Sequence, residues 1–308
     1  MSRSYTPPSN PILIIVGPTA SGKSGLAVEI AKKLNGEIIS ADSRQVYKGL
    51  DIGTGKVTTK EMGGIPHHLL DVKSPKNIFT AHEYVRLGRT IIQDIQSRRK
   101  IPIVVGGTGF YIDALVGRIR LPDVPPDLAL RKQLDKKSAE QLFTLLQKDD
   151  PRRAQAMNTP SERNNKIRLI RALEIALSQT TVPQITSEHP RAAKLIWIGI
   201  TTDPDELRER ITKRLKSRLK IGMIAEARQL HAKGLSYKRM EELGLEYRSL
   251  ARFLKGIITR TELESELNRD ISQYAKRQLT YWKRNHDIQW FKRTDINAIV
   301  IMITNSKE

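Results

Sequence analysis

One stretch near the start of the chain has the residue types and spacing of a phosphate-binding loop. Residues 17–24 fit the pattern G-x-x-x-x-G-K-[ST]. In such a loop the glycines let backbone N–H groups close around phosphate oxygens, the lysine adds positive charge and the last hydroxyl can hold Mg²⁺. The sequence therefore predicts a di- or triphosphate site, with Mg²⁺ at Ser24, made by Gly17, Pro18, Thr19, Ala20, Ser21, Gly22, Lys23 and Ser24.

Two further polar residues, Asp42 and Thr108, closely follow predicted strands at 37–41 and 101–105. The carboxyl ends of strands in an open parallel sheet surround the ligand crevice, so both side chains are expected to face the phosphate site. Position alone leaves a second interpretation for each, because Asp42 could cap a helix and Thr108 could be a turn residue. The second strand ends in Gly106-Gly107-Thr108, where an ATPase often carries a metal-binding aspartate.

Two basic segments suggest a polyanionic partner. Residues 208–220 contain seven Lys or Arg against one Glu, and Arg210, Arg214 and Arg218 lie together beside an apolar helical stripe. In residues 275–284, basic, amide and aromatic side chains alternate, a combination that can hold phosphates and stack on an unpaired base. The alternative interpretation of both segments is a solvated or partly buried helix face.

Composition narrows the class of protein. The chain has 308 residues, a formal charge of +20 and 39% hydrophobic residues, so it can build a core and is not a disordered tail. Without cysteine, disulfides, Cys-ligated zinc and thiol catalysis are excluded. The apolar run at residues 12–16 is too short for a signal sequence or a membrane span, so we expect a cytoplasmic protein with no membrane contact.

The elements that must position these residues follow an α/β order. Short apolar runs predict buried strands at 12–16, 37–41, 101–105 and 195–200, and helical spacing predicts helices at 24–34, from 80 to about 97, and through 204–285. Such alternation implies a parallel sheet. Residues 298–303 are expected to form a last strand. Residues 121–190 read as a helical insertion, which leaves 1–120 and 191–308 as the core domain. His67 and His68 are adjacent and point to opposite faces of an extended segment, so a shared metal is not expected.

Six segments resemble the tRNA dimethylallyltransferase (tRNA isopentenyltransferase) family. GPTASGKS, ADSRQVYKGLDIGTGK, PHHLLD, VVGGTGFYI, RLIRALEI and YAKRQLTYWKR occur in that family's order and spacing over about residues 11–285. The resemblance implies an α/β fold with a P-loop kinase-like parallel sheet flanked by helices and a mostly helical insertion domain. It also implies transfer of a dimethylallyl group from dimethylallyl diphosphate to N6 of adenine 37 in the tRNA anticodon loop, with release of diphosphate and with Mg²⁺ as cofactor. A monomer is expected.

The resemblance also implies roles for particular residues. Asp42 would be the general base, Thr108 would orient the adenine, and Lys23, Arg210 and Arg214 would stabilise the leaving diphosphate. The expected tRNA-binding residues are Asp42, Ser43, Arg44, Gln45, Thr108, Ile167, Arg168, Leu169, Ile170, Arg171, Arg248, Lys276, Arg277, Gln278, Thr280 and Lys283. The sequence Gly244–Arg248 differs from the motif that is common at this place in the family. Some members carry a C-terminal zinc finger, which the absence of cysteine excludes here.

Three other functions compete with this one. A P-loop small-molecule kinase would use Lys23 and Ser24 equally well, but it would not need the basic surface. An adenylate isopentenyltransferase would not need the basic helical insertion. A non-enzymatic RNA-binding P-loop protein would have no use for Asp42 and Thr108. The residues alone, without the resemblance, indicate a P-loop enzyme with a nucleic-acid partner.

Overall fold

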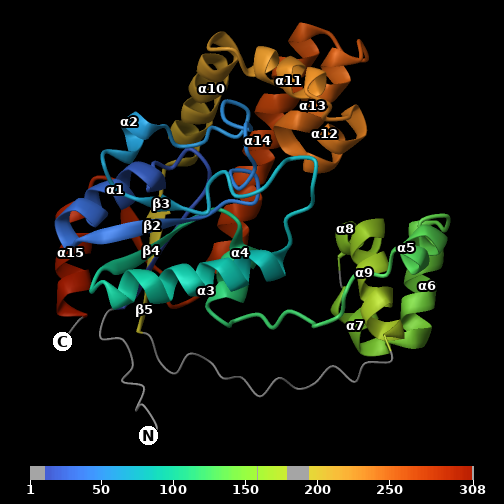
Figure 1. The fold of residues 1–308 in the computed structure, drawn as a ribbon, viewed down its shortest axis with the longest axis horizontal. Helices are drawn as coiled ribbons and strands as arrows, with labels where there is room; N and C mark the ends of the chain where they lie inside the picture. Colours follow the sequence, from blue (N-terminus) through green and yellow to red (C-terminus); the bar gives the residue numbers. More distant parts are fainter. Residues whose placement is uncertain (1–10, 158, 179–193, 307–308) are drawn as a thin grey trace, which may run out of the picture. The chain divides into compact units, whose positions relative to one another are not determined.

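The computed structural model describes residues 11–157, 159–178 and 194–306. The chain divides into two compact units, one made of Met1–Ile119 with Pro190–Glu308 and the other of Arg120–His189. The first unit contains the sheet, and every described element of the second is a helix (Figure 1). No helix among the described residues is both long and apolar enough to cross a bilayer.

The first unit is built on a six-stranded parallel sheet in the order β3-β2-β4-β1-β5-β6. The strands are β1 Ile12–Val16, β2 Gly36–Ala41, β3 His67–His68, β4 Ile101–Gly106, β5 Leu195–Thr201 and β6 Gln289–Lys292. Strand β1 is central, and Ile15 is in register with Val105 of β4 and Ile198 of β5. All residues of β1, β2 and β4 are buried, as expected where helices cover both faces of a sheet.

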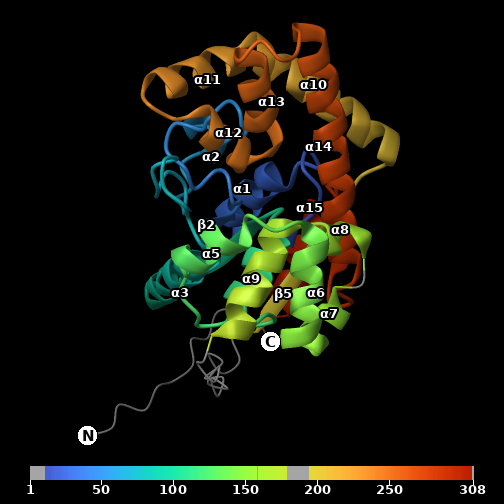
Figure 2. The same cartoon turned by 90° about the vertical axis from the view of Figure 1, so that its right-hand side faces the viewer.

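Helices cover the two faces of this sheet with separate cores (Figures 1 and 2). Leu13 and Ile15 pack with α1 and α15, whereas Ile14 and Val16 share a cluster with α3, α4 and α14, because side chains alternate along a strand. The helices of this unit are α1 Lys23–Leu34, α2 Thr59–Met62, α3 Ala81–Ser97, α4 Gly109–Leu115, α10 Pro204–Lys220, α11 Met223–Ala232, α12 Tyr237–Leu243, α13 Leu245–Leu254, α14 Arg260–Lys283 and α15 Ile296–Asn305.

Capping residues set where two of the helices begin. The Thr80 hydroxyl accepts a hydrogen bond from the Glu83 amide at 3.1 Å, and the Glu83 carboxylate accepts one from the Thr80 amide at 2.9 Å. This is the capping box that starts α3. Asp203 caps α10, and Pro204 occupies its first turn.

The prediction of a last strand at 298–303 is wrong. These residues lie in helix α15, and the sixth strand is β6 at Gln289–Lys292. The β-branched composition of the segment favours a strand, but Ile299 and Ile303 are one helical turn apart and are both buried in the core beside α1. Tertiary packing therefore overrides local propensity here.

The second unit contains α5 Leu128–Leu134, α6 Ala139–Asp149, α7 Pro151–Ala156, α8 Pro160–Arg163 and α9 Lys166–Leu177. Its core includes a buried carboxylate, Glu174, which binds the Arg131 and Arg171 guanidinium groups and accepts a 2.7 Å hydrogen bond from the Asp127 amide. Burial alone would raise the pKa of Glu174, but these hydrogen bonds lower it to about 2. The carboxylate therefore stays ionised and ties α5 to α9.

A second buried carboxylate, Glu37, lies at the start of β2. It is 2% exposed and binds the Arg98 guanidinium, the Lys100 ammonium at 2.8 Å and the His68 ring at 2.8 Å. The Arg98 guanidinium is the main reason that the pKa of Glu37 lies well below its usual range. His68 thus serves this ion-pair cluster.

We expect Glu37→Gln to lower the free energy of unfolding at neutral pH by about 2 kcal/mol, because the cations lose a charged hydrogen-bond acceptor. Since the folded-state pKa is lowered, the stabilisation is present above the unfolded pKa of about 4.3 and is lost as pH falls below it. Urea denaturation of wild type and variant between pH 3 and 7 measures both effects. An unchanged urea midpoint at pH 7 would contradict this account of the cluster.

Candidate active site

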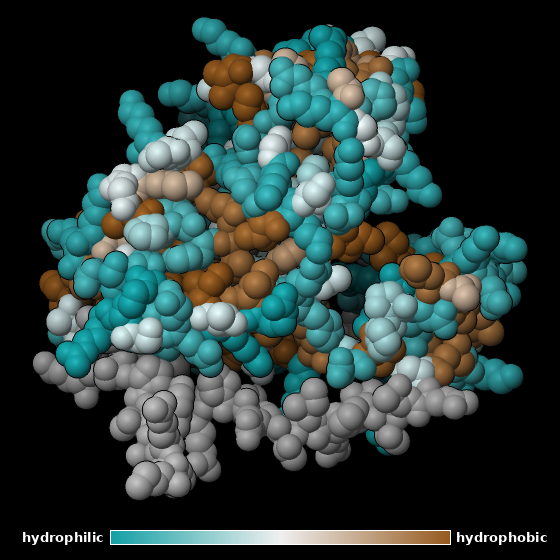
Figure 3. All heavy atoms as spheres, in the orientation of Figure 1, coloured by the Kyte–Doolittle hydropathy of each residue, from teal (hydrophilic) through white to brown (hydrophobic). Residues whose placement is uncertain are grey.

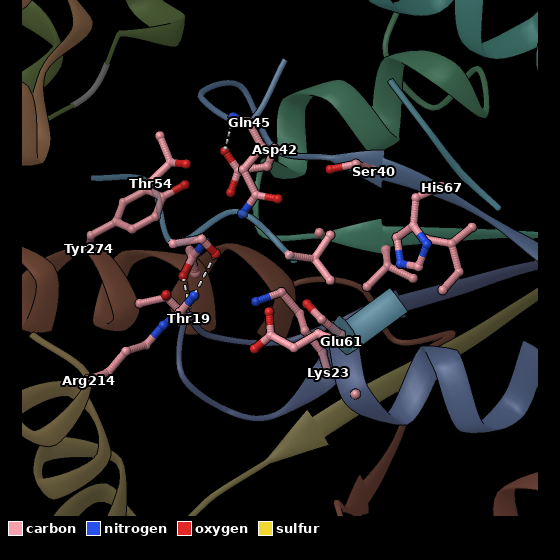
Figure 4. A pocket seen from close by; sticks show the side chains of 18 residues that line it. Thr19, Lys23, Ser40, Asp42, Gln45, Thr54, Glu61, His67, Arg214 and Tyr274 are labelled. Carbon is pink, nitrogen blue, oxygen red and sulfur yellow. Dashed lines mark hydrogen bonds between the residues drawn. The ribbon is translucent and has the colours of Figure 1, made fainter. Parts of the chain in front are cut away.

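A cavity of about 250 Å³ opens at the carboxyl ends of β2 and β4, beside the phosphate loop (Figure 4). It is lined by Thr19, Lys23, Ser24, Gly25, Ile38, Ser40, Asp42, Gln45, Thr54, Gly55, Val57, Glu61, His67, Val105, Gly106, Arg214, Tyr274 and Gln278. The lining comes from six regions of the sequence, 19–25, 38–45, 54–67, 105–106, 214 and 274–278, which the sheet and α10 and α14 bring together. It combines the cations Lys23 and Arg214, the carboxylates Asp42 and Glu61, and an apolar group made by Ile38, Val57 and Val105.

The phosphate loop leaves the start of α1 open to a ligand. Its N-cap, Gly22, has a left-handed backbone with φ of 86° and no side chain to cap the helix. The first amides of a helix have no partner within it, so they and the positive end of the helix dipole face the cavity. Lys23 donates a 3.2 Å hydrogen bond to the Pro18 carbonyl, and Ser24 is exposed in the cavity wall. The loop therefore has the open helix start and the nearby cation that an anion site requires.

The electrostatics of Lys23 follow from its surroundings. Burial lowers the pKa of Lys23 to about 8, the Asp42 carboxylate opposes this, and the Arg214 guanidinium adds to the lowering. In Figure 4 the Lys23 ammonium points into the space between Asp42 and Arg214. A bound anion there would offset the repulsion between the two cations, so the cavity favours a negatively charged ligand.

Asp42 does not cap a helix, because the residues that follow it form a turn, but it has a structural role as well as a position in the cavity. Its Oδ1 accepts hydrogen bonds from the Arg44 amide at 2.8 Å and the Gln45 amide at 3.3 Å, which fixes the turn after β2. The same carboxylate lines the cavity, and Oδ2 makes no hydrogen bond within the described chain. One oxygen holds the turn while the other remains available to accept a proton.

Thr108 lies beside Asp42, as the strand order predicts. Its hydroxyl accepts a 3.1 Å hydrogen bond from the Ser43 amide, and its own amide donates to the Ala41 carbonyl at 3.1 Å. The Tyr274 hydroxyl is close to the same threonine. Burial, and then the Asp42 charge, raises the pKa of Tyr274 to about 12, while the contact with Thr108 opposes that rise. Tyr274 is therefore a neutral phenol at this edge of the site.

Gln278 has a different position from the one that the sequence suggested. It is 5% exposed, and its Oε1 accepts a 2.7 Å hydrogen bond from the Thr19 amide of the phosphate loop. A side chain on Gly107 would place a Cβ 1.7 Å from Gln278 Nε2, so only glycine lets the two segments approach this closely. The structure thus assigns Gln278 to holding the loop rather than to an exposed tRNA surface.

The three arginines predicted to lie together on α10 separate into three environments. Arg214 enters the cavity wall, and burial followed by repulsion from Arg218 lowers its pKa. Arg218 is buried, and it donates to the Gly53 carbonyl at 2.8 Å and binds Glu246 at 3.2 Å. Arg210 instead pairs with Glu206 at 2.6 Å and is not part of the cavity lining. Of the two arginines predicted to contact diphosphate, only Arg214 is placed to do so.

Most predicted tRNA-binding residues outside the cavity are exposed. On α14 these are Lys276, Arg277, Thr280 and Lys283, and on α13 it is Arg248. Figure 3 shows mainly hydrophilic residues over the part of the molecule formed by α11, α12 and α13.

The predicted tRNA-binding segment 167–171 on α9 is only partly exposed. Ile167 is 82% exposed, and Arg168 is exposed and pairs with Glu162 at 3.1 Å. Leu169 and Ile170 are buried in the core of the second unit, which corrects their assignment as tRNA-contacting side chains. Arg171 binds Glu174 and donates to the Val124 carbonyl at 2.8 Å, so it has a structural partner already.

A protein family and several curated proteins match this chain over most of its length. The family model described as IPP transferase matches residues 45–285. The chain belongs to the IPP transferase family. It is 43% identical over 290 residues to tRNA dimethylallyltransferase 2 of Citrifermentans bemidjiense, which covers 94% of this chain and 89% of that protein. It is 38% identical over 288 residues to tRNA dimethylallyltransferase of Anoxybacillus flavithermus, covering 92% and 91%.

Two solved structures of similar proteins have the same fold. One is the tRNA isopentenylpyrophosphate transferase of Bacillus halodurans, with a TM-score of 0.72, 36% identity and 97% of both chains covered. The other is a eukaryotic dimethylallyltransferase described as acting on tRNA, with a TM-score of 0.75 and 28% identity, covering 94% of this chain and 75% of that one. These likenesses confirm both the family resemblance and the fold predicted for an IPP transferase.

Several site residues of this IPP transferase were not singled out from the sequence. Tyr274 precedes Gln278 by one helical turn, so the spacing of the two on one face of α14 could have indicated it. Thr54 and Gly55 lie inside the quoted GLDIGTGK segment, but nothing in their types predicts that they line a cavity. Glu61 forms the capping box of α2 together with Thr58, and it also lines the cavity. The capping-box pattern in the sequence does not indicate that Glu61 would reach the cavity.

Proposed function

We propose that this chain transfers the dimethylallyl group of dimethylallyl diphosphate to N6 of adenine 37 in the anticodon loop of tRNA, and that diphosphate is released. The observation that carries the proposal is the cavity itself, where an open phosphate loop, Lys23 and Arg214 share the lining with Asp42. Thr108 lies next to Asp42 through its hydrogen bond with the Ser43 amide. The family, its curated relatives and the structure described as acting on tRNA support the same reaction. We also propose that a monomer is the active form.

The cationic side of the cavity would stabilise the leaving group. The amine at N6 of adenine is a poor nucleophile because its lone pair is delocalised into the ring, so C1 of the donor must become strongly electrophilic as its bond to diphosphate breaks. Negative charge then grows on the diphosphate oxygens. The open amides at the start of α1, the Lys23 ammonium and the Arg214 guanidinium are fixed donors aimed at that charge.

The opposite side of the cavity would handle the adenine. As the N6–C1 bond forms, the proton on N6 passes to the Asp42 carboxylate, whose Oδ2 is available while Oδ1 holds the turn. The Thr108 hydroxyl, held by the Ser43 amide, would orient the base. Adenine must leave its stack in the anticodon loop to reach these groups, at a cost of about a few kcal/mol that contacts along the RNA must offset.

The residues present fit a bound Mg²⁺ with few protein ligands. Ser24 lies exposed in the cavity wall next to Lys23, and within the described chain no three His, Asp or Glu side chains gather as a metal site. Mg²⁺ commonly keeps several waters and binds through one or two protein groups plus substrate phosphates, which is the arrangement that Ser24 and a diphosphate allow. When bound, the ion would neutralise charge on the diphosphate.

The proposal is tested by offering the protein a choice of acceptors. Purified protein is incubated with radiolabelled dimethylallyl diphosphate, Mg²⁺ and either unmodified tRNA or AMP, and the labelled product is identified. Label on tRNA supports the proposal, and label on AMP alone would assign the chain to free nucleotide instead. No transfer to either acceptor would contradict a prenyltransferase function.

The exposed basic residues of α14 predict a strongly salt-dependent association with tRNA. Each phosphate contact releases counterions, so neutralising Lys276 or Arg277 should reduce the slope of log affinity against log salt by about 0.7 to 0.9. Filter binding of Lys276→Gln and Arg277→Gln with unmodified tRNA at several salt concentrations measures this. A salt slope near zero for the wild-type protein would exclude RNA as the partner of this surface.

A further inference from the structure

The segment 51–56 forms a compact loop that makes one wall of the cavity. The Lys56 amide donates to the Asp51 carbonyl at 2.9 Å, the Gly55 amide donates to the Ile52 carbonyl at 3.1 Å, and the Thr54 hydroxyl donates to the Leu50 carbonyl at 2.6 Å. Within this loop, Thr54 and Gly55 line the cavity. These internal bonds make the loop rigid, so its position depends on what anchors it from outside.

The principal outside anchor is one carboxylate, Glu226 on α11. Its Oε2 accepts hydrogen bonds from the amides of Asp51 at 3.0 Å and Ile52 at 2.7 Å. Its Oε1 accepts one from the Gly53 amide at 2.8 Å and one from the Tyr247 hydroxyl at 2.6 Å. Four donors from the loop and α13 therefore converge on a single side chain, and three of them are consecutive backbone amides. Hydrogen bonds to a charged acceptor are stronger than neutral ones.

The anchored loop in turn fixes the arginine that faces the diphosphate site. Arg214 donates a 2.8 Å hydrogen bond to the Gly55 carbonyl. A Cβ on Gly55 would lie 2.3 Å from Arg214 Nη2, so the guanidinium packs directly on this backbone. Behind it, Arg218 donates to the Gly53 carbonyl and pairs with Glu246. A shift of the loop would therefore move the Arg214 guanidinium.

On the side that faces α11, the loop also borders open space. A second cavity, of about 350 Å³, separates residues 49–52 from the turn between α10 and α11, and Glu226 itself lines it. Because empty space offers no packing contacts, the hydrogen bonds to Glu226 add to the packing of Ile52 in restraining movement in that direction.

We propose that Glu226 is a positioning residue for donor binding: by holding the 51–55 backbone, it keeps Arg214 and the cavity wall in the geometry that binds the diphosphate of the prenyl donor. This inference rests on the proposed function for the identity of the donor, although the anchoring itself does not. The hydrogen-bond partners of Glu226, residues 51–53 and Tyr247, do not line the donor cavity, so Glu226 acts through the loop and Arg214.

The test compares Glu226→Gln with a matched control, Glu266→Gln, which removes another partly buried helix carboxylate whose partner is Arg252, away from the loop. Glutamine keeps the size of the side chain but replaces one acceptor oxygen with an NH2 group, which cannot accept a hydrogen bond from the loop amide or amides that it faces. We expect Glu226→Gln to raise KM for dimethylallyl diphosphate and the Kd for Mg²⁺-diphosphate measured by calorimetry by at least about tenfold, which equals about 1.4 kcal/mol. Affinity for tRNA and kcat should change by less than about threefold, and Glu266→Gln should match wild type.

The outcomes separate positioning from general stability and from the proposed function. If Glu226 were merely structural, its loss would lower the active fraction, so kcat would fall while KM and the diphosphate Kd stayed constant, and the inference would be overturned. An unchanged diphosphate Kd in Glu226→Gln that is folded by circular dichroism would also overturn it. If the wild-type protein failed to prenylate tRNA, the proposed function would fail, but calorimetry with Mg²⁺-diphosphate would still decide whether Glu226 sets anion affinity.

Discussion

Replacement of Lys23 by alanine is expected to abolish prenyl transfer, with a fall of at least about 10³-fold in the single-turnover rate. Removing one preorganised donor to a developing anion costs about 10² to 10³ in rate, and Lys23 carries a full charge at the centre of the cavity. Affinity for tRNA should remain within about threefold, because this ammonium addresses the diphosphate. Rapid-quench assays with radiolabelled donor and filter binding of tRNA measure the two quantities separately.

An appropriate control for Lys23 is Lys283→Ala, which removes a cation from the exposed face of α14. This control should weaken tRNA binding and leave donor affinity unchanged, the opposite of the Lys23 pattern. Unchanged single-turnover chemistry in Lys23→Ala would remove the phosphate loop from the reaction.

Asp42→Asn is expected to lower turnover by at least about 10²-fold, because the amide cannot accept the proton that leaves N6. The asparagine Oδ1 can still accept from the Arg44 and Gln45 amides, so the urea midpoint should hardly move. Asp42→Ala should lose both functions, with a similar fall in rate and a loss of about 1 kcal/mol in stability. Single-turnover rates and urea midpoints of the two variants distinguish them.

The result that excludes Asp42 as the base is an Asn variant that keeps more than a tenth of the wild-type rate. If Asp42 served only to form the turn, Asp42→Asn would keep more than a tenth of the wild-type rate and Asp42→Ala would be less stable than wild type. The comparison is informative because the structure uses only one carboxylate oxygen for the turn.

The parts of the fold that the sequence predicted are those where one local signal is strong. Strand β1 is a continuous apolar run that ends at Gly17, and α3 begins at a capping box, so both were predicted within a residue or two. The segment 298–303 was predicted wrongly because its β-branched residues favour a strand, whereas burial of Ile299 and Ile303 one turn apart favours the observed helix. Strand β3 is only two residues long and leaves no periodic pattern to detect.

The candidate site was predictable where function requires a contiguous motif. The phosphate loop and Asp42 come from such segments, and the structure places both at one cavity. Tyr274 and Arg214 reach the same cavity through helix packing, and a single helix sequence shows only that residues share a face. Helical spacing in the sequence placed Arg210 and Arg214 on one face of the same helix. In the structure only Arg214 binds the loop 51–56, through the Gly55 carbonyl. The anchoring role of Glu226 depends on a backbone conformation that no side-chain pattern encodes.

The hydrogen bond between the Thr19 amide and Gln278 joins residues 259 positions apart. At a synthesis rate of roughly 5 to 20 residues per second, the phosphate loop is made on the order of 10 to 50 s before the side chain that secures it. During that interval β1, α1 and β2 can assemble, but the cavity lacks its α14 wall, including Tyr274 and Gln278. A nascent or prematurely terminated chain therefore cannot assemble the site and should neither sequester the prenyl donor nor alkylate RNA, so the order of synthesis itself keeps unfinished chains inactive.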